Sequence, residues 1–112
     1  MSIKLPQLIA AFVQAKNDHD SNALIACFAD EAVVHDEGKE ILGIAAIKKW
    51  IDASNAKYQV TLDVISFIER KDGTILTAQV SGNFEGSPIP LDYHLTVNEG
   101  KISKLSIRLA GD

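Results

Sequence analysis

The sequence contains a single cysteine, no dense run of lysine or arginine, and no long apolar segment. Because a disulfide needs two cysteines, Cys27 cannot form one within the chain, and its apolar neighbours predict a buried thiol. The 11 basic residues are outnumbered by 15 acidic ones, which gives a net charge of -4 and argues against a nucleic-acid partner. His19, His35 and His94 are widely spaced, so we expect no metal site.

Apolar stretches are short throughout the chain. The longest, such as residues 8–13, fall far below the ~20 residues that cross a bilayer, so we expect no membrane partner. The first residues are amphipathic and no small-residue cleavage site follows them, so we expect no secretory signal and a cytoplasmic location. With 112 residues, 46% of them hydrophobic, the sequence fits one domain over residues 1–112.

Three helices are predicted in the first half of the chain, each from a different signal. Apolar residues at helical spacing predict a helix over about 6–17, with Pro6 in its first turn. Asp20 or Ser21 can cap a short second helix. An apolar stripe predicts a third helix over about 43–56.

The second half of the chain alternates between apolar and polar residues, which is typical of strands. The alternation predicts four strands, over residues 58–64, 76–84, 91–97 and 105–109. Turns are predicted at 72–73, 86–90 and 98–100, which arranges these strands as an antiparallel meander. Phase shifts between 64 and 67 and between 102 and 105 predict bulges that curl the sheet. Three N-terminal helices against one side of a strongly curved antiparallel sheet make an α+β half-open cone.

A short strand over residues 33–36 precedes the third helix and ends in acidic residues, with a turn predicted at 37–39. Val34 and Asp36 share one face of this strand, and His35 points to the other. If Val34 faces the core, Asp36 lies at the inner end of the strand, where a carboxylate is costly unless it is paired, hydrogen-bonded or used. Asp36 is then either a general base or a structural carboxylate that caps the next turn or pairs with a lysine. Glu37 is expected in solvent.

Several short segments carry a family resemblance. They are FADEA at 28–32 with HDEG at 35–38, then Gly43 with Ala46, Ile47 and Trp50, and later GSP at 86–88 before LDY at 91–93. Together with the order of elements, they resemble the SnoaL-like branch of the nuclear transport factor 2-like superfamily over nearly the whole chain. The resemblance implies a cone-shaped pocket, frequent dimerisation through the sheet, and functions that range from cyclases and isomerases to non-catalytic binding.

Ketosteroid isomerase, a relative in this superfamily, is similar to the segment 28–47 and keeps its catalytic carboxylate where Asp36 stands. The similarity implies a general base at Asp36. The helix tyrosine of that enzyme's oxyanion hole corresponds to Phe12, which has no hydroxyl, so that part is not reproduced. The second residue of that oxyanion hole corresponds to Asp92 if the sequence motif is matched. It corresponds to Tyr93 if the alternation of inward and outward residues along the strand is matched. We favour Tyr93, because a one-residue slip would expose the whole apolar row.

These observations predict a pocket protein that works without a cofactor. The predicted catalytic residues are Asp36 and Tyr93, and the predicted ligand-binding residues are Phe12, Val34, Trp50 and Tyr58. The predicted reaction is proton transfer on a small hydrophobic or carbonyl-bearing molecule by an isomerase, cyclase or hydrolase. The alternative is a non-catalytic ligand-binding or dimeric accessory protein. A third hypothesis is a protein-interaction domain that uses the outer sheet face, where His94 and other polar residues point.

Overall fold

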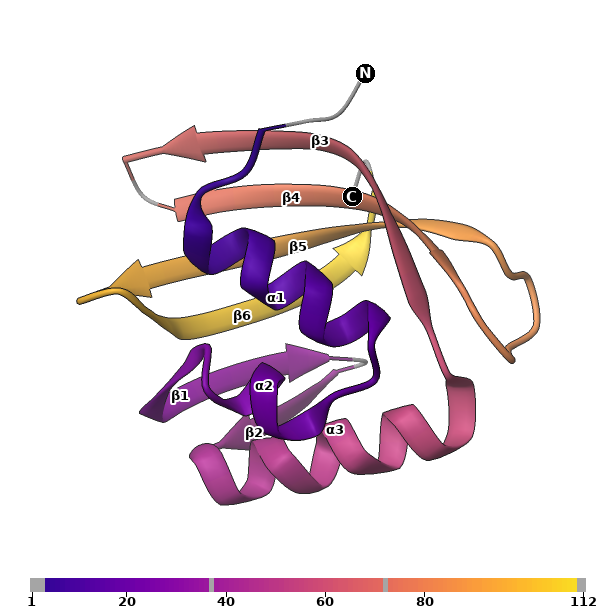
Figure 1. The fold of residues 1–112 in the computed structure, drawn as a ribbon, viewed down its shortest axis with the longest axis horizontal. Helices are drawn as coiled ribbons and strands as arrows, with labels where there is room; N and C mark the ends of the chain where they lie inside the picture. The colour runs from indigo at the N-terminus through magenta and orange to yellow at the C-terminus, as the bar shows by residue number, and fades with distance from the viewer. Residues whose placement is uncertain (1–3, 37, 72, 111–112) are drawn as a thin grey trace.

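The computed structural model describes residues 4–36, 38–71 and 73–110, which form three helices and six strands (Figure 1). The helices are α1 (Gln7–Asn17), α2 (Ser21–Ile25) and α3 (Ile44–Tyr58). The strands are β1 (Phe28–Asp36), β2 (Lys39–Leu42), β3 (Thr61–Arg70), β4 (Gly73–Ser81), β5 (Ile89–Asn98) and β6 (Lys101–Leu109). Of the predicted turn and surface residues, Glu37 and Asp72 lie outside the described residues. None of the described helices has the length and hydropathy to cross a bilayer.

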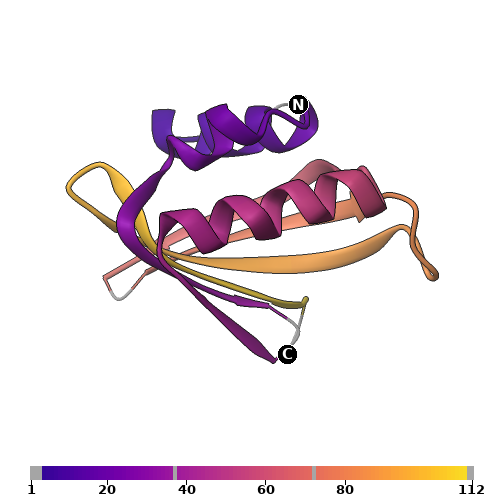
Figure 2. The same cartoon turned by 90° about the horizontal axis from the view of Figure 1, so that it is seen from below.

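The strands form one sheet in the order β2-β1-β6-β5-β4-β3. The four strands of the predicted meander are antiparallel neighbours, whereas β1 joins the sheet by pairing in parallel with β6. The sheet is strongly bent, and the three helices lie on its concave side (Figure 2). The α+β cone that the sequence predicts is therefore the observed fold, with one parallel pair among its antiparallel strands.

The predicted cap of the second helix and both predicted bulges are present, whereas Pro6, predicted in the first turn of the first helix, lies just before it. The Asp20 carboxylate accepts a hydrogen bond of 3.1 Å from the backbone N–H of Ala23 at the start of α2. The β3–β4 register shifts between Val64 and Ser66. In the β5–β6 pair the register shifts between Thr96 and Val97, so that the extra residue lies on β6 between residues 102 and 104. These irregularities add to the curvature of the sheet.

The prediction that Tyr58 begins a strand is wrong, because α3 continues through Tyr58. Gln59 then adopts a left-handed backbone with φ 49°, and this residue ends the helix. The segment before it contains neither glycine nor proline, so nothing local stops the helix at residue 56. The consequence is that Tyr58 projects from a helix and not from the sheet.

The prediction that the strand over residues 76–84 ends at residue 84 is also wrong, because the corresponding strand β4 ends at Ser81. At Gly82 the chain passes so close to the end of α3 that an added Cβ would lie 2.7 Å from the backbone oxygen of Tyr58. The N–H of Asn83 donates to that same oxygen at 2.7 Å. A side chain at position 82 would break this approach, so glycine is required there.

The strand around Val34 is longer than predicted, and it has an antiparallel neighbour that the sequence pattern does not reveal. β1 begins at Phe28, and β2 pairs with it from Lys39 to Leu42. β2 is an edge strand with only one of its four residues partly covered. It therefore lacks the alternation that predicts strands, because neither of its faces is deeply buried.

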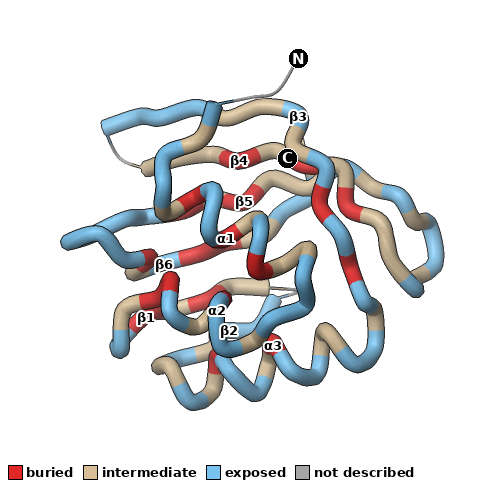
Figure 3. Tube along the Cα trace, viewed as in Figure 1, coloured by how far each residue is buried: buried red, intermediate tan, exposed pale blue. Residues whose placement is uncertain are grey.

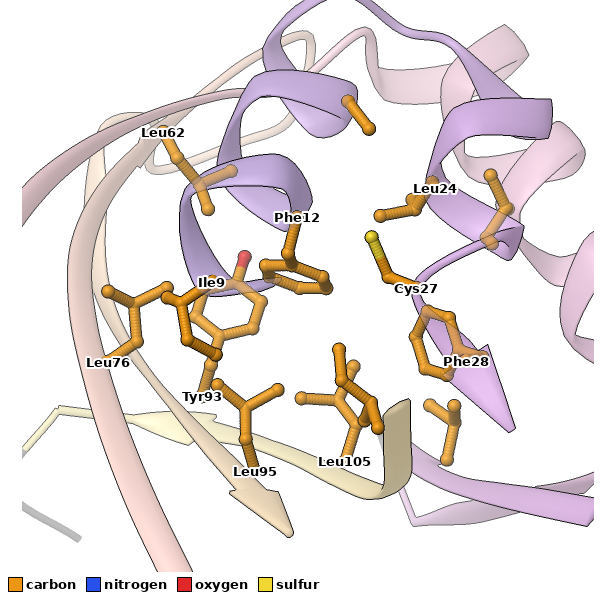
Figure 4. Packing of buried hydrophobic residues seen from close by; sticks show 14 of the residues in the cluster. Ile9, Phe12, Leu24, Cys27, Phe28, Leu62, Leu76, Tyr93, Leu95 and Leu105 are labelled. Atoms are coloured by element: carbon orange, nitrogen blue, oxygen red, sulfur yellow. The ribbon is translucent and has the colours of Figure 1, made fainter. Parts of the chain in front are cut away.

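The core fills the space between α1 and the concave face of the sheet (Figure 3). Phe12 lies at its centre and contacts two rings edge-on, with centroid distances of 6.4 Å to Phe28 and 5.9 Å to Tyr93. The close-up shows this cluster between the helix and strands β5 and β6 (Figure 4). Such edge-to-face pairs add roughly 0.5–1.5 kcal/mol each beyond the burial of their area.

The C-terminal end of α1 is fixed to the start of β3 by side chains. The Asn17 amide accepts a hydrogen bond of 2.6 Å from the backbone N–H of Leu62 and donates one of 3.1 Å to its carbonyl. The imidazole of His19 lies 2.8 Å from the carbonyl oxygen of Val60. These contacts join residues more than forty positions apart in the sequence, so they determine how α1 lies across the sheet.

We predict that Asn17→Ala lowers the free energy of unfolding by about 1–3 kcal/mol, because it leaves two partly buried backbone groups of Leu62 without their partner. Urea denaturation followed by circular dichroism measures the change. Gln14→Ala is the matched control, since the Gln14 amide bonds only to the exposed carboxylate of Asp18. An equal loss in the two variants would contradict the structural role of Asn17.

Candidate functional site

A cavity of about 330 Å³ opens between the C-terminal half of α3, the end of α1 and the concave face of the sheet. Its wall is mostly apolar and is formed by Val60, Val80, Phe84, Ile89, Leu91 and Ile107. Its polar groups come from Lys16, Asp36, Trp50, Ser54, Tyr58, Glu85 and Tyr93. An apolar hollow with a few convergent polar groups is the usual form of a small-molecule site.

Asp36 is the last residue of β1 and lines this cavity. It shares the inner face of the strand with Val34, which is completely buried, as the alternation of side chains predicts. Trp50 on α3 donates a hydrogen bond of 3.3 Å from its indole Nε1 to Asp36 Oδ2. The predicted inward carboxylate thus lies at the edge of the hollow, with one oxygen positioned by an indole.

Trp50 reaches Asp36 because of its place on α3. The neighbouring helix residues Ile47 and Ile51 are buried against the sheet. Trp50 therefore lies at the edge of the apolar face of α3. There its ring is partly buried and lines the cavity. Its position next to the pocket agrees with the prediction, and its single donor is used on Asp36.

Lys16 is a site residue that the sequence analysis does not identify. Its Nζ lies 5.9 Å from the ring centroids of both Trp50 and Tyr93. Burial lowers the pKa of Lys16 from 10.5 to about 8, and the negative charge of Asp36 opposes part of that shift. A signal was present, because Lys16 follows Phe12 by one helical turn and therefore lies on the buried face of α1.

Tyr93 faces inward on β5, and only 2% of it is exposed. The choice of strand phase over motif is therefore right, since Asp92 points outward and accepts a hydrogen bond of 2.5 Å from Thr77. Burial raises the pKa of Tyr93, and the charge of Asp36 raises it further. Its phenol stays neutral at physiological pH and can donate a hydrogen bond.

Tyr58 and Phe84 form one lip of the cavity. Their rings meet edge-on with centroids 6.2 Å apart, which the close approach at Gly82 makes possible. The Nζ of Lys57 lies 5.0 Å from the centroid of the Tyr58 ring. Tyr58 therefore lines the cavity as predicted, although it belongs to a helix.

The structure places Phe12 and Val34, the other two predicted ligand-binding residues, in the core. Their exposed fractions are 1% and 0%, and neither belongs to the lining of the cavity. Phe12 supports the site from beneath, through its contact with the Tyr93 ring. The cavity wall on the sheet comes instead from residues such as Leu91 and Ile107.

A second hollow, of about 350 Å³, lies beside the first. Asp36 and Ile107 line both hollows. The other residues of the second hollow include Ser106 and Arg108, which alternate with Ile107 and so belong to the outer face of β6. His35 also lines it, and its Nε2 lies 3.9 Å from a carboxylate oxygen of Glu40. As predicted, His35 and Asp36 occupy opposite faces of β1.

The described residues contain no group of three or more His, Cys, Asp or Glu side chains that could hold a metal ion. The reactive groups that line the cavity are two carboxylates, an amine, two phenols and the Ser54 hydroxyl. With an indole donor on the carboxylate and apolar walls, this set can bind a hydrophobic molecule and move a proton on it.

Comparison with solved structures finds close likeness in fold. A protein from Sinorhizobium meliloti, provisionally named a polyketide cyclase, is 34% identical over 93% of this chain and 95% of its own, with a TM-score of 0.88. A hypothetical protein from Catenulispora acidiphila with a ketosteroid isomerase-like fold, in complex with trimethylamine, is 20% identical over 96% of this chain and 88% of its own, with a TM-score of 0.83.

TerC, co-crystallised with polyporic acid, is 17% identical over 92% of this chain and 88% of its own, with a TM-score of 0.80. Comparison with curated proteins finds no match. The family model described as the SnoaL-like domain matches residues 9–105. That span contains the end of α1, the acidic end of β1 and every residue of the cavity lining except Ile107. This chain is therefore a member of the SnoaL-like domain family.

Proposed function

We propose that this protein is a cytoplasmic enzyme that transfers a proton, without a cofactor, on a small hydrophobic molecule bearing a carbonyl group. The observation that carries the proposal is the Asp36 carboxylate on the margin of an apolar cavity, with the Trp50 indole bonded to it. Isomerisation, cyclisation and hydrolysis all begin with a proton transfer of this kind.

In this mechanism Asp36 removes a proton from the carbon next to the carbonyl group, or from a water molecule. Negative charge then develops on the carbonyl oxygen. A hydroxyl of Tyr93 or Tyr58 donates a hydrogen bond to that oxygen, and this replaces the donor that is missing at Phe12. The raised pKa of Tyr93 suits this role, because the phenol keeps its proton in the presence of Asp36. Trp50 restrains the carboxylate throughout.

The solved structures lend support to the class of ligand. The Sinorhizobium meliloti protein carries the name of a polyketide cyclase, and it is 34% identical to this chain. TerC was crystallised with polyporic acid. Both names point to hydrophobic molecules with oxygen functions, which fits a cavity whose walls are apolar and whose polar groups gather at Asp36, Trp50 and Tyr93.

The alternative is a non-catalytic binding protein, and one specific observation favours it. Lys16 lies close enough to Asp36 for the negative charge of the carboxylate to raise the pKa of the lysine. The carboxylate also accepts the Trp50 hydrogen bond. A carboxylate in such a network can serve the fold alone. The two functions differ in one measurable property, which is whether a bound carbonyl compound exchanges its protons with water.

We predict that the protein accelerates the exchange of the α-protons of cyclohexanone for deuterium in heavy water, as measured by NMR. Asp36→Asn should lower this rate by about 10²–10⁴-fold, because asparagine still accepts the Trp50 hydrogen bond but cannot take up a proton. Circular dichroism should show an unchanged fold. Asp52→Asn is the control, since that carboxylate is exposed and pairs with Lys48 at 3.0 Å.

Quenching of Trp50 fluorescence reports ligand binding separately, because Trp50 is the chain's single tryptophan. Binding of cyclohexanone with no exchange in the unmodified protein would establish the non-catalytic alternative. Exchange at the full rate in Asp36→Asn would remove Asp36 from the mechanism.

We also propose that the outer face of the sheet pairs with a second copy of the chain. A row of directly opposed residues crosses this face, from His35 through Ser106, His94 and Ile75 to Ile68. Ser106 in the middle of the row is 8% exposed, whereas Ile68 at its end is 45% exposed. A sheet face that combines polar and apolar groups suits a symmetric, partly hydrated interface.

Light scattering should accordingly give a mass near twice the 12.1 kDa of one chain. Ile68→Glu should shift the protein toward the monomer, because it places a charge on the contact face. Glu69→Gln on the same strand is the control. A monomer at high protein concentration would exclude the dimer.

A further inference from the structure

The amine of Lys16 is placed in the cavity in a way that a structural ion pair does not require. Its Nζ faces the rings of Trp50 and Tyr93 at equal centroid distances of 5.9 Å. These aromatic groups and the apolar wall remove water from around the amine. The titratable groups that share the cavity with it are Asp36, Tyr58, Glu85 and Tyr93.

This setting changes the chemistry of the amine. A lysine becomes a nucleophile when burial disfavours its charged form, because only the neutral amine has a free electron pair. With a pKa of about 8, about a tenth of the Lys16 side chains are neutral at pH 7, far more than for an ordinary lysine with a pKa near 10.4. Asp36 in the same cavity supplies a group that can carry protons.

We propose that Lys16 Nζ forms a covalent imine with an aldehyde or ketone held in the cavity. The inference rests on the proposed function in one respect, namely that the ligand bears a carbonyl group. It extends that function by assigning the electrophilic activation of the carbonyl to a residue of α1. The reactive groups then come from three elements, since Asp36 ends β1 and Tyr93 belongs to β5.

The reaction is balanced without any oxidant or reductant. Asp36 first takes a proton from the Lys16 ammonium group, which frees the electron pair of Nζ. That pair attacks the carbonyl carbon, a C–N bond forms, and the π electrons of the C=O bond move to oxygen. A proton passes from nitrogen to that oxygen, which gives a carbinolamine. The nitrogen electron pair then expels the oxygen, which takes up a second proton from the Asp36 carboxyl group and leaves as water. The product is a protonated imine, and Asp36 is again a carboxylate.

The imine strengthens the proton transfer at Asp36. A protonated C=N bond withdraws electrons more strongly than a C=O bond, so the α-proton of the bound ligand becomes more acidic. Lys16 thereby takes over the activating role of the hydroxyl that Phe12 lacks. The aromatic rings of Trp50 and Tyr93 stabilise the positive charge of the protonated imine, as they do that of the ammonium group.

Reduction with borohydride tests the proposal. The full chain is incubated with cyclohexanone at pH 7, sodium borohydride is added, and intact mass and peptide mapping locate the reduced adduct. We expect one cyclohexyl group per chain, on Lys16, formed at least tenfold faster than on Lys48, whose side chain is 47% exposed and paired with Asp52. Lys16→Arg should abolish the adduct while keeping the positive charge, and Lys48→Arg should leave it unchanged.

The pH dependence gives a second readout. Adduct formation at Lys16 should rise with a midpoint near pH 8, whereas exposed lysines should rise toward pH 10 and above. Because the charge of Asp36 raises the pKa of Lys16, Asp36→Asn should move the midpoint to lower pH. Labelling of Lys16 no faster than of Lys48 at every pH would overturn the proposal.

The two proposals fail independently. If cyclohexanone exchanges its α-protons while Lys16 in the unmodified protein remains unlabelled, the imine is excluded and the action of Asp36 as a base remains. If Lys16 is labelled without exchange, the covalent site stands and the proton transfer is excluded. Neither outcome depends on whether a Lys16 variant folds, because both are measured on the unmodified chain.

Discussion

The structure depends on the attachment of α1 to β3. Asn17 bonds to both backbone groups of Leu62, and His19 reaches the carbonyl of Val60. These contacts hold the helix at one angle across the sheet, and Lys16, one residue earlier, is carried into the cavity as a result. An ammonium group among aromatic rings costs free energy of desolvation, so it persists there only because contacts elsewhere on the same helix fix its position.

Much of the fold follows from periodicity alone. Helical spacing in the first half and alternation in the second predict the helices and the meander, because each of these elements buries one face. β2 is missed because it is an exposed edge strand. The end of α3 is misplaced because Tyr58 alternates with Val60 as a strand residue would, although it belongs to the helix. The left-handed residue that ends the helix is Gln59, not glycine.

The candidate site is only half visible in the sequence. Alternation along the strands places Asp36 and Tyr93 inward, and the apolar face of α3 places Trp50 near them. Three of the polar groups of the cavity therefore follow from local geometry. Phe12 and Val34 face inward as well, but they lie deeper, in the core, and local pattern cannot separate a cavity wall from the interior. Lys16 is missed because a lysine is ordinarily assigned to solvent, and its position on the buried face of α1 was outweighed by its charge.

The arrangement of the two hollows has a consequence for turnover. Because Asp36 lines both, a ligand that fills the inner hollow covers the carboxylate from one side and leaves its other side facing the second hollow. In the proposed mechanism, a proton taken from the ligand can pass into this second hollow while the ligand stays bound. The base is then renewed before the product leaves.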